Sequence, residues 1–281
     1  MKSNSLHCIT CGAPLETTLH QLNCTVCNAA FPLQSGIPIF GNADEVAEWT
    51  SYHTELGKTG EVAGGNYLSE QPSNENSFYS RFLPDNAREV LDAGGGDGNT
   101  TAEWAARHPH ATVKVMDLSI HGLKKVLKRN IPNMHPICAP ADRRFPFDAA
   151  SFDTISTVFL VEHMVPDALN RFLAEAFRCL KPGGKLVVAS DTAFYDAVLH
   201  PLERLIKTGK YIANDPTHIN LMTPGQCEAI VAQHGFQLSG RTIHWIAGRH
   251  KLAQYFYRLI PNRLAEALFS TMYVIEAQKP L

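Results

Sequence analysis

The chain has 281 residues, of which 44% are hydrophobic and 19% are charged. This length suits one large domain with a smaller one, and the apolar share is ordinary for a protein with a buried core. The 25 basic and 27 acidic side chains give a formal net charge of −2, which argues against a general nucleic-acid binder, since such proteins usually carry a basic face. The sequence has no apolar run of about 18 residues and begins without a hydrophobic leader, so we expect no membrane span and a cytoplasmic protein.

Two C-x-x-C pairs lie near the N-terminus, and their spacing predicts a structural metal site. The pairs are Cys8 with Cys11 and Cys24 with Cys27. Each pair can form a tight knuckle, and four thiolates supply a closed tetrahedral site that favours Zn²⁺, with iron as the alternative ion. A segment this short cannot bury a core of its own, so metal binding would contribute its folding free energy. Disulfides are the competing interpretation, which a reducing cytoplasm disfavours.

The sequence after these cysteines, AFPLQSGIPIF at 30–40, resembles the end of small zinc ribbons of the Trm112-like type. The resemblance implies a zinc ribbon over residues 1–42, with a hairpin shaped by Gly36 and Pro38. Residues 43–85 then form either a lid over a cofactor site or a disordered linker. Within them, a helix is expected over 44–52, and the candidate lid residues are Tyr52, His53 and Tyr67.

Residues 90–98, with the sequence VLDAGGGDG, join an apolar strand to a helix expected over 100–107. The strand ends in Asp92 and runs into a turn of four glycines, which can adopt positive φ and approach a ligand closely. A strand, a glycine turn and a helix bind nucleotide-like cofactors at the carboxyl end of a parallel sheet. The glycine spacing fits neither the dinucleotide fingerprint G-x-G-x-x-G nor the phosphate loop G-x-x-x-x-G-K-[ST].

An acid followed by glycines at alternate positions resembles motif I of the class I methyltransferases that use S-adenosylmethionine. Later segments follow in the order typical of that family, and the resemblance covers about residues 86–281. It implies an α/β fold with a Rossmann-like seven-stranded sheet and helices on both faces. The later segments are an acid, Asp117, after the expected strand 113–116; AD at 141–142 with FPF at 145–147 and SFD at 151–153; VEH at 161–163 after the expected strand 154–160; KPGG at 181–184, which is expected to end a helix and enter a strand; and a closing strand at 272–277.

The same resemblance implies a site for S-adenosylmethionine. Asp92 and the glycine turn would hold the methionine part of the cofactor, Asp117 the ribose hydroxyls and Asp142 the adenine amino group. The residues expected at the cofactor site are Asp92, Gly94, Gly95, Gly96, Asp117, Leu118, Ala141, Asp142 and Phe159.

Two histidines are candidates for the general base that methyl transfer to a hydroxyl or amine can require, because His titrates near neutral pH. His163 follows the fourth expected strand, at the edge of the sheet where ligands bind. His218 lies in a segment, 214–220, that resembles the one after the fifth strand in small-molecule methyltransferases. A hydrogen-bonded structural histidine is the alternative for both. A cap-like insert over about 191–222 is expected to set substrate specificity.

These features favour a methyltransferase that modifies an oxygen or nitrogen of a small-molecule metabolite, with a structural zinc ribbon and a possible homodimer. An rRNA or tRNA base methyltransferase is the first alternative, because a zinc ribbon ahead of such a domain resembles the bacterial 23S rRNA guanine-N1 methyltransferases. Binding RNA phosphates calls for a basic groove, and the ribbon up to Phe40 has one Lys and no Arg. A non-catalytic partner or scaffold is the second alternative, against which the intact set of cofactor residues argues.

Overall fold

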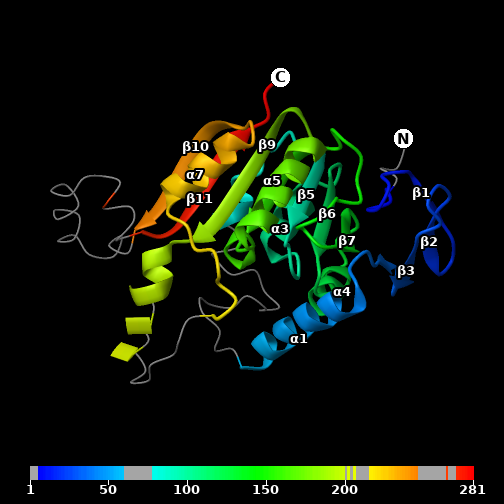
Figure 1. Cartoon of the computed structure of the whole chain (residues 1–281), viewed down its shortest axis with the longest axis horizontal. Helices are drawn as coiled ribbons and strands as arrows, with labels where there is room; N and C mark the ends of the chain where they lie inside the picture. The colour runs from blue at the N-terminus through cyan, green and yellow to red at the C-terminus, as the bar shows by residue number, and fades with distance from the viewer. Residues whose placement is uncertain are drawn as a thin grey trace.

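A computed structural model of the chain describes residues 6–59, 78–199, 201–202, 205–206, 215–245, 264 and 270–281. Its main part is a seven-stranded sheet with helices on both faces, and a small four-stranded sheet lies beside it (Figure 1). Within these described residues, no helix combines the length and the apolar character that crossing a membrane requires. Tyr67 and residues 207–214 of the expected cap lie outside the described residues.

The small sheet contains the first four strands of the chain, paired antiparallel in sequence order. Its hydrophobic side is buried through Leu22, Phe31 and Phe40, and the rings of Phe31 and Phe40 lie 4.7 Å apart. Gly36 has a φ of 81° in the tight turn between the last two strands, a conformation that glycine adopts without steric cost. The strands are β1 (Leu15–Thr17), β2 (Gln21–Cys24), β3 (Ala30–Gln34) and β4 (Ile37–Pro38).

The small sheet is attached to the edge strand of the large one, β7 (Met134–Cys138). The backbone N–H of Phe40 donates to the carbonyl of Cys138 at 2.7 Å. Gly12, in the first C-x-x-C knuckle, packs against Arg144, and a Cβ on this glycine would lie 2.5 Å from the Arg144 Nη2. Buried residues of both sheets belong to one continuous hydrophobic cluster, so the ribbon is built onto the larger fold.

Helix α1 (Ala43–Thr59) follows the ribbon directly and lies beside α4 (Ile120–Lys128), as Figure 1 shows. Its first turn is closed by two reciprocal hydrogen bonds. The Glu45 N–H donates to the Asn42 side chain at 2.9 Å, and the Asn42 N–H donates to the Glu45 carboxylate at 3.3 Å. The helix is longer than the expected 44–52.

The large sheet has the strand order β10-β11-β9-β8-β5-β6-β7. Strands β9, β8, β5, β6 and β7 are parallel, whereas β11 is antiparallel to both of its neighbours. The predicted seven-stranded α/β sheet is therefore confirmed. Its remaining strands are β5 (Glu89–Ala93), β6 (Thr112–Asp117), β8 (Phe152–Val158), β9 (Leu180–Asp191), β10 (Gln237–Trp245) and β11 (Ser270–Gln278).

Helices cover both faces of this sheet because its central strands are apolar on both sides. In β9, Leu186 and Val188 face the cluster formed with α5 (Pro166–Cys179) and α7 (Pro224–Gln233). Val187 and Ala189 alternate with them and pack on the opposite face. Farther along that opposite face, the sheet is covered by α3 (Asn99–Arg107) and α4.

Two element boundaries differ from the sequence-based expectation. Residues 181–184 lie inside β9, where a shift of register between Phe152 and Thr154 on the neighbouring strand accommodates the extra residues as a bulge. In the expected cap, residues 195–199 form a single π-helical turn, η2 (Tyr195–Leu199), and further helical residues are described at 201–202 and 205–206.

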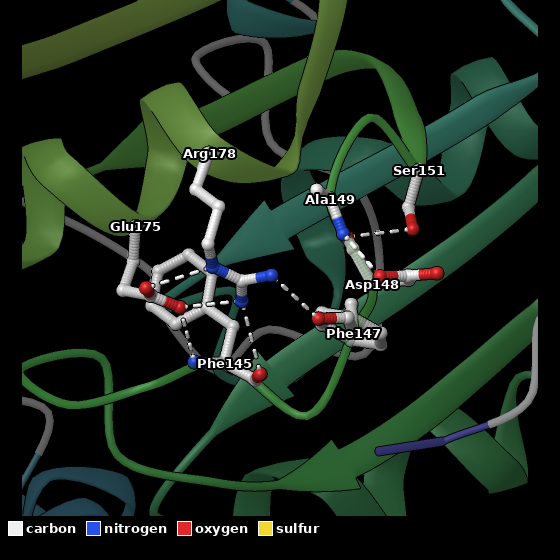
Figure 2. Close-up of polar contacts among 7 residues, drawn as sticks. All are labelled: Phe145, Phe147, Asp148, Ala149, Ser151, Glu175 and Arg178. Carbon is white, nitrogen blue, oxygen red and sulfur yellow. Dashed lines mark hydrogen bonds and ion pairs between the residues drawn. The ribbon is translucent and has the colours of Figure 1, made fainter. Parts of the chain in front are cut away.

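The loop between β7 and β8 is held on α5 by one arginine (Figure 2). The Arg178 guanidinium donates to the carbonyls of Phe147 at 3.0 Å and Phe145 at 3.3 Å. It also pairs with the Glu175 carboxylate at 2.6 Å, and that carboxylate accepts the Phe145 N–H at 2.8 Å. These contacts fix the path of the chain from Asp142 into β8.

Candidate active site

The glycine turn after β5 approaches its neighbours more closely than other residue types allow. The N–H groups of Gly94 and Gly95 both donate to the carbonyl of Met116 at the end of β6, at 2.8 and 3.2 Å. A Cβ on Gly94, where φ is 71°, would lie 2.9 Å from Leu160, and one on Gly95 would lie 2.8 Å from the Asp92 carboxyl group. The missing side chains let Leu160 and the Asp92 carboxyl group pack directly against the turn.

Asp92 lies beneath the turn and is 1% exposed. It accepts hydrogen bonds from the hydroxyls of Thr101 at 2.9 Å and Ser156 at 3.3 Å, so it joins α3 to β8. Burial raises the pKa of Asp92 to about 7. It is not among the residues that line the pocket described below, and its contact with a cofactor stays a prediction.

Asp117 ends β6 beside the glycine turn. Its Oδ2 accepts the Gly96 N–H at 3.0 Å, and its Oδ1 accepts the N–H of Ser119, the N-cap of α4, at 2.7 Å. The backbone therefore orients both oxygens, and each keeps lone-pair capacity for a further donor.

A pocket of about 290 Å³ opens at the carboxyl ends of β5, β6 and β8. It includes seven residues expected at the cofactor or catalytic site: Gly94, Asp117, Leu118, Ala141, Asp142, Phe159 and His163. Gly95, Gly96 and His218 lie beside it without lining it. The lining residues that the motifs did not identify are Glu45, Trp49, Met116, Ala139, Leu160, Met164, Val165, Ala168 and Ile219, and His53, expected as a lid residue, also lines it.

Asp142 lies at the pocket rim between two arginines. Its carboxylate is 3.6 Å from the Nε of Arg143 and 3.7 Å from the Nη2 of Arg171. Its backbone carbonyl accepts the Arg171 Nε–H at 2.8 Å. These contacts hold a carboxylate that remains one-third exposed and able to accept a hydrogen bond from a ligand.

Helix α1 supplies one wall of the pocket through Glu45, Trp49 and His53. Glu45 pairs with Arg143 across the pocket rim. Farther along the helix, the Thr50 hydroxyl accepts the N–H of Ile120 at 3.1 Å, which fixes α1 on the start of α4. In the sequence, this wall is marked by acidic, aromatic and histidine side chains at positions 45, 49, 52 and 53. A helix brings them together because 45, 52 and 53 each lie three or four residues from 49.

His163 also lines the pocket, from the 3₁₀ turn η1 (Val161–His163). Its ring lies 4.8 Å from the ring of His218 and 5.6 Å from that of Trp49. Its Nδ1 is 2.9 Å from the Thr217 hydroxyl and 3.2 Å from the Thr217 carbonyl. Burial lowers the pKa of His163 to about 4, and the neighbouring His218 acts in the same direction, so the ring is neutral at pH 7.

Asp215 connects α1 to the segment that carries His218. It accepts hydrogen bonds from the Tyr52 hydroxyl and, at 2.6 Å, from the Thr217 hydroxyl. Burial alone would raise the pKa of Asp215, but the hydrogen bonds from Thr217 and Tyr52 outweigh it and hold the pKa below its ordinary value. The Asp215 carboxylate is therefore charged at neutral pH.

The four cysteines of the ribbon meet at one point, as their spacing predicts. Their sulfur atoms all lie within 4.8 Å of one another, with Cys8 to Cys27 at 3.5 Å and Cys11 to Cys24 at 3.4 Å. The Cys27 N–H lies 3.5 Å from the Cys24 Sγ, and this contact lowers the pKa of Cys24 to about 6. Sulfurs bound to one Zn²⁺ at about 2.3 Å are about 3.8 Å apart in a tetrahedron, so this donor set fits zinc.

Residues 90–184 match the sequence family described as a methyltransferase domain. The chain is 29% identical over 143 residues to the ubiquinone/menaquinone biosynthesis C-methyltransferase UbiE of Vibrio cholerae. This match covers 46% of this chain and 53% of that protein. The chain is 25% identical over 159 residues to the tRNA N(3)-cytidine methyltransferase METTL2 of Mus musculus, covering 53% of this chain and 40% of that protein. The chain thus spans about half the length of the curated relatives it matches, or less.

Among solved structures, the chain resembles the 1,6-didemethyltoxoflavin-N1-methyltransferase of Burkholderia thailandensis, which holds 1,6-didemethyltoxoflavin and S-adenosylhomocysteine. The TM-score is 0.54 at 16% sequence identity, and the match covers 93% of this chain and 100% of the other. At this identity the likeness shows a shared fold, the Rossmann-like fold of class I methyltransferases. The three proteins named here methylate different kinds of acceptor by their names, so they do not identify an acceptor for this chain.

Proposed function

We propose that this chain, whose residues 90–184 match the family of methyltransferase domains, is an S-adenosylmethionine-dependent methyltransferase that acts on an oxygen or nitrogen of a small metabolite. The observation that carries the proposal is the pocket at the carboxyl ends of β5, β6 and β8. Ligands of open parallel sheets bind at this edge. Its volume lies near the lower end of the range for small-molecule sites, which starts at about 300 Å³.

The residues at this edge suit S-adenosylmethionine. Asp117 has two oriented oxygens that can accept the ribose hydroxyls, and Asp142 presents a carboxylate at the rim for the adenine amino group. Gly94 of the glycine turn lines the pocket, and no atom lies within 4 Å of the position a Cβ on Gly96 would take, which suits the methionine part. When bound, this cofactor supplies a methyl group on a positively charged sulfur, and the protein supplies orientation and electrostatics.

The acceptor side of the pocket is proposed to be the wall formed by His163 and Trp49, with His218 behind it. Helix α1 covers this wall and is tied to it by the hydrogen bond from Tyr52 to Asp215. A covered pocket suits a small acceptor better than a base within a large RNA. The net charge of −2 and the single Lys in the ribbon support the same choice.

An RNA base is the second candidate acceptor, favoured by the similarity to a tRNA N(3)-cytidine methyltransferase. A non-catalytic role as a partner or scaffold is the third. We also propose that Cys8, Cys11, Cys24 and Cys27 hold one structural zinc ion, which would stabilise the ribbon.

The test is calorimetric titration of the full chain, purified free of nucleic acid, with S-adenosylmethionine and S-adenosylhomocysteine. We expect micromolar binding at one site per chain, and one zinc per chain in a Cys-dependent site. Labelled methyl transfer to pooled metabolites and to total tRNA and rRNA would then identify the acceptor class. Transfer to RNA alone would contradict the small-metabolite proposal, and no cofactor binding by the folded, zinc-loaded chain would favour the scaffold role.

A further inference from the structure

A second group of metal-ligating side chains lies beside the pocket, about the carboxyl ends of β8 and β9. It consists of Glu162 and His163 in η1 and His218 in the last part of the expected cap, 191–222. One ligand atom from each residue lies within 4.8 Å of those of the other two. Ligands on a single ion at about 2.1 Å lie about 3 to 4 Å apart, so small side-chain rotations would bring the three together.

The main chain holds this group in place. The carbonyl of Glu162 accepts the N–H groups of Ile219 and Asn220, both at 2.9 Å, which fixes the His218 segment on η1. The Glu162 side chain is fully buried, and its Oε2 accepts the hydroxyl of Ser190 at 3.0 Å. A buried, oriented carboxylate that faces two imidazoles is a common donor set for a metal ion.

The hydrogen bonds around Thr217 determine which nitrogen of His163 can bind an ion. The Thr217 hydroxyl donates its proton to Asp215 at 2.6 Å, so at 2.9 Å from the His163 Nδ1 it acts as the acceptor. The Thr217 carbonyl, 3.2 Å from the same nitrogen, also accepts. The proton is therefore on Nδ1, which leaves the Nε2 lone pair as the one that can bind an ion. Metal-binding histidines are held in this way, by a carbonyl or carboxylate on their other nitrogen.

The local charge also favours a cation. Asp215, on the other side of Thr217, is paired through hydroxyl donors, which leave its negative charge in place. Two imidazole nitrogens and one carboxylate suit Zn²⁺, Fe²⁺ or Mn²⁺ better than Ca²⁺ or Mg²⁺, which prefer oxygen ligands throughout.

We propose that Glu162, His163 and His218 bind one divalent transition-metal ion beside the pocket, separate from the four-cysteine site of the ribbon. The site is distinct from the proposed cofactor residues and does not require that methyl transfer be the activity. It assigns Glu162 a ligand role and gives both histidines a role other than that of a free base.

The test is a titration of the full chain with Mn²⁺. The loss of the electron paramagnetic resonance signal of the free ion measures binding. The chain is first loaded with one equivalent of Zn²⁺, which the thiolates of the ribbon retain against Mn²⁺ because affinity follows ligand softness and the Irving–Williams order. We expect one Mn²⁺ per chain. The substitutions Glu162→Gln and His218→Ala should each weaken binding at least tenfold.

His234→Ala is the matched control, because the Nδ1 of His234 bonds to the carbonyl of Ile230 on α7, outside the cluster. It should bind Mn²⁺ as the parent does. Circular dichroism and the retained ribbon zinc report whether each variant is folded, and the milder variant His218→Gln is used if His218→Ala is not. No Mn²⁺ binding by the parent, or equal binding by the folded Glu162 and His218 variants, overturns the proposal. Mn²⁺ binding without any affinity for S-adenosylmethionine would support the metal site and count against the methyltransferase function alone.

Discussion

Asp117 links the glycine turn to α4 through one hydrogen bond on each carboxylate oxygen, from the Gly96 N–H at 3.0 Å and the Ser119 N–H at 2.7 Å. The carboxylate therefore has a fixed direction before any ligand arrives. An oriented acceptor costs little reorganisation when it receives the hydroxyls of a ribose.

Replacing this carboxylate should weaken cofactor binding. We expect Asp117→Ala to reduce the affinity for S-adenosylhomocysteine by roughly 1–3 kcal/mol, because ribose hydroxyls would lose their acceptor and the Gly96 and Ser119 N–H groups their partner. Calorimetric titration measures the change. Asp85→Ala, at an acid whose side chain is 89% exposed, is the control and should bind as the parent does. Equal affinities for parent and Asp117→Ala would show that the ribose is not held at β6.

A second prediction concerns the wall that α1 provides. Trp49 lines the pocket and packs edge-on against His163, 5.6 Å between ring centroids. Trp49→Ala should lower ligand affinity by roughly 1–2 kcal/mol, since the ligand would lose an aromatic surface and the pocket would open to water. Glu48→Ala, at an exposed position on the same helix, keeps the wall intact and serves as the control. The helix would be irrelevant to binding if both variants titrate alike.

The sheet and part of the site could be predicted because their signals are local. Asp92 and the glycines after it mark a strand-to-helix turn, and Asp117 ends an apolar run; each of these is visible within a few residues. Parallel strands bring such ends to one edge, so Gly94, Asp117 and Asp142 were expected together and do line one pocket.

The wall formed by α1 could be predicted only in outline, because it depends on contacts between distant segments. Trp49 reaches the pocket since the ribbon is anchored at Phe40 to β7, which sets where α1 begins. The hydrogen bond from Tyr52 to Asp215 connects positions 163 residues apart in the sequence, and no local pattern marks such a pair. Glu162 precedes His163 directly in the sequence, but its place beside His218 follows from the two hydrogen bonds to its own carbonyl.

A third prediction concerns pH. Burial raises the folded-state pKa of Asp92 to about 7 from an ordinary value of 3.8. The folded state therefore binds this proton more tightly than the unfolded state does. The stability that this proton contributes is complete below about pH 4 and is lost as the pH rises to about 7. Relative to the parent, Asp92→Asn should gain up to about 3 kcal/mol of unfolding free energy between pH 5 and pH 8, at about 1.36 kcal/mol for each pKa unit. Urea unfolding of both proteins at pH 5 and pH 8 measures this difference. If the free energy of unfolding changes equally with pH in the parent and in Asp92→Asn, the carboxyl group is ionised throughout.

A fourth prediction tests the arginine that holds the loop between β7 and β8. Arg178→Met keeps most of the apolar stem but removes the donors to Phe145 and Phe147 and leaves the Glu175 carboxylate, 16% exposed, without its partner. We expect the free energy of unfolding to fall by about 2–4 kcal/mol, which is less than for breaking a fully buried ion pair. Arg107→Met, in an ion pair whose side chains are 54% and 42% exposed, should cost less than about 1 kcal/mol. Thermal or urea unfolding would show similar losses for both variants if the loop contacts were not stabilising.

The last prediction connects the ribbon to the pocket. The ribbon strand β4 leads through Phe40, bonded to Cys138, into α1, whose Glu45 and Trp49 line the pocket. If the cysteine site is emptied, the anchor for α1 loosens, and the affinity for S-adenosylhomocysteine should fall about tenfold, or about 1.4 kcal/mol. A chelator would strip both proposed metal sites, so Cys24→Ser, which removes one proposed zinc ligand of the ribbon alone, is the cleaner variant. Zinc analysis and calorimetry on the same sample measure loss of the ion and loss of affinity together. A zinc-free variant that binds the ligand as tightly as the parent would mean that α1 holds its position without the ribbon, through the contacts of Thr50 with Ile120 and Tyr52 with Asp215.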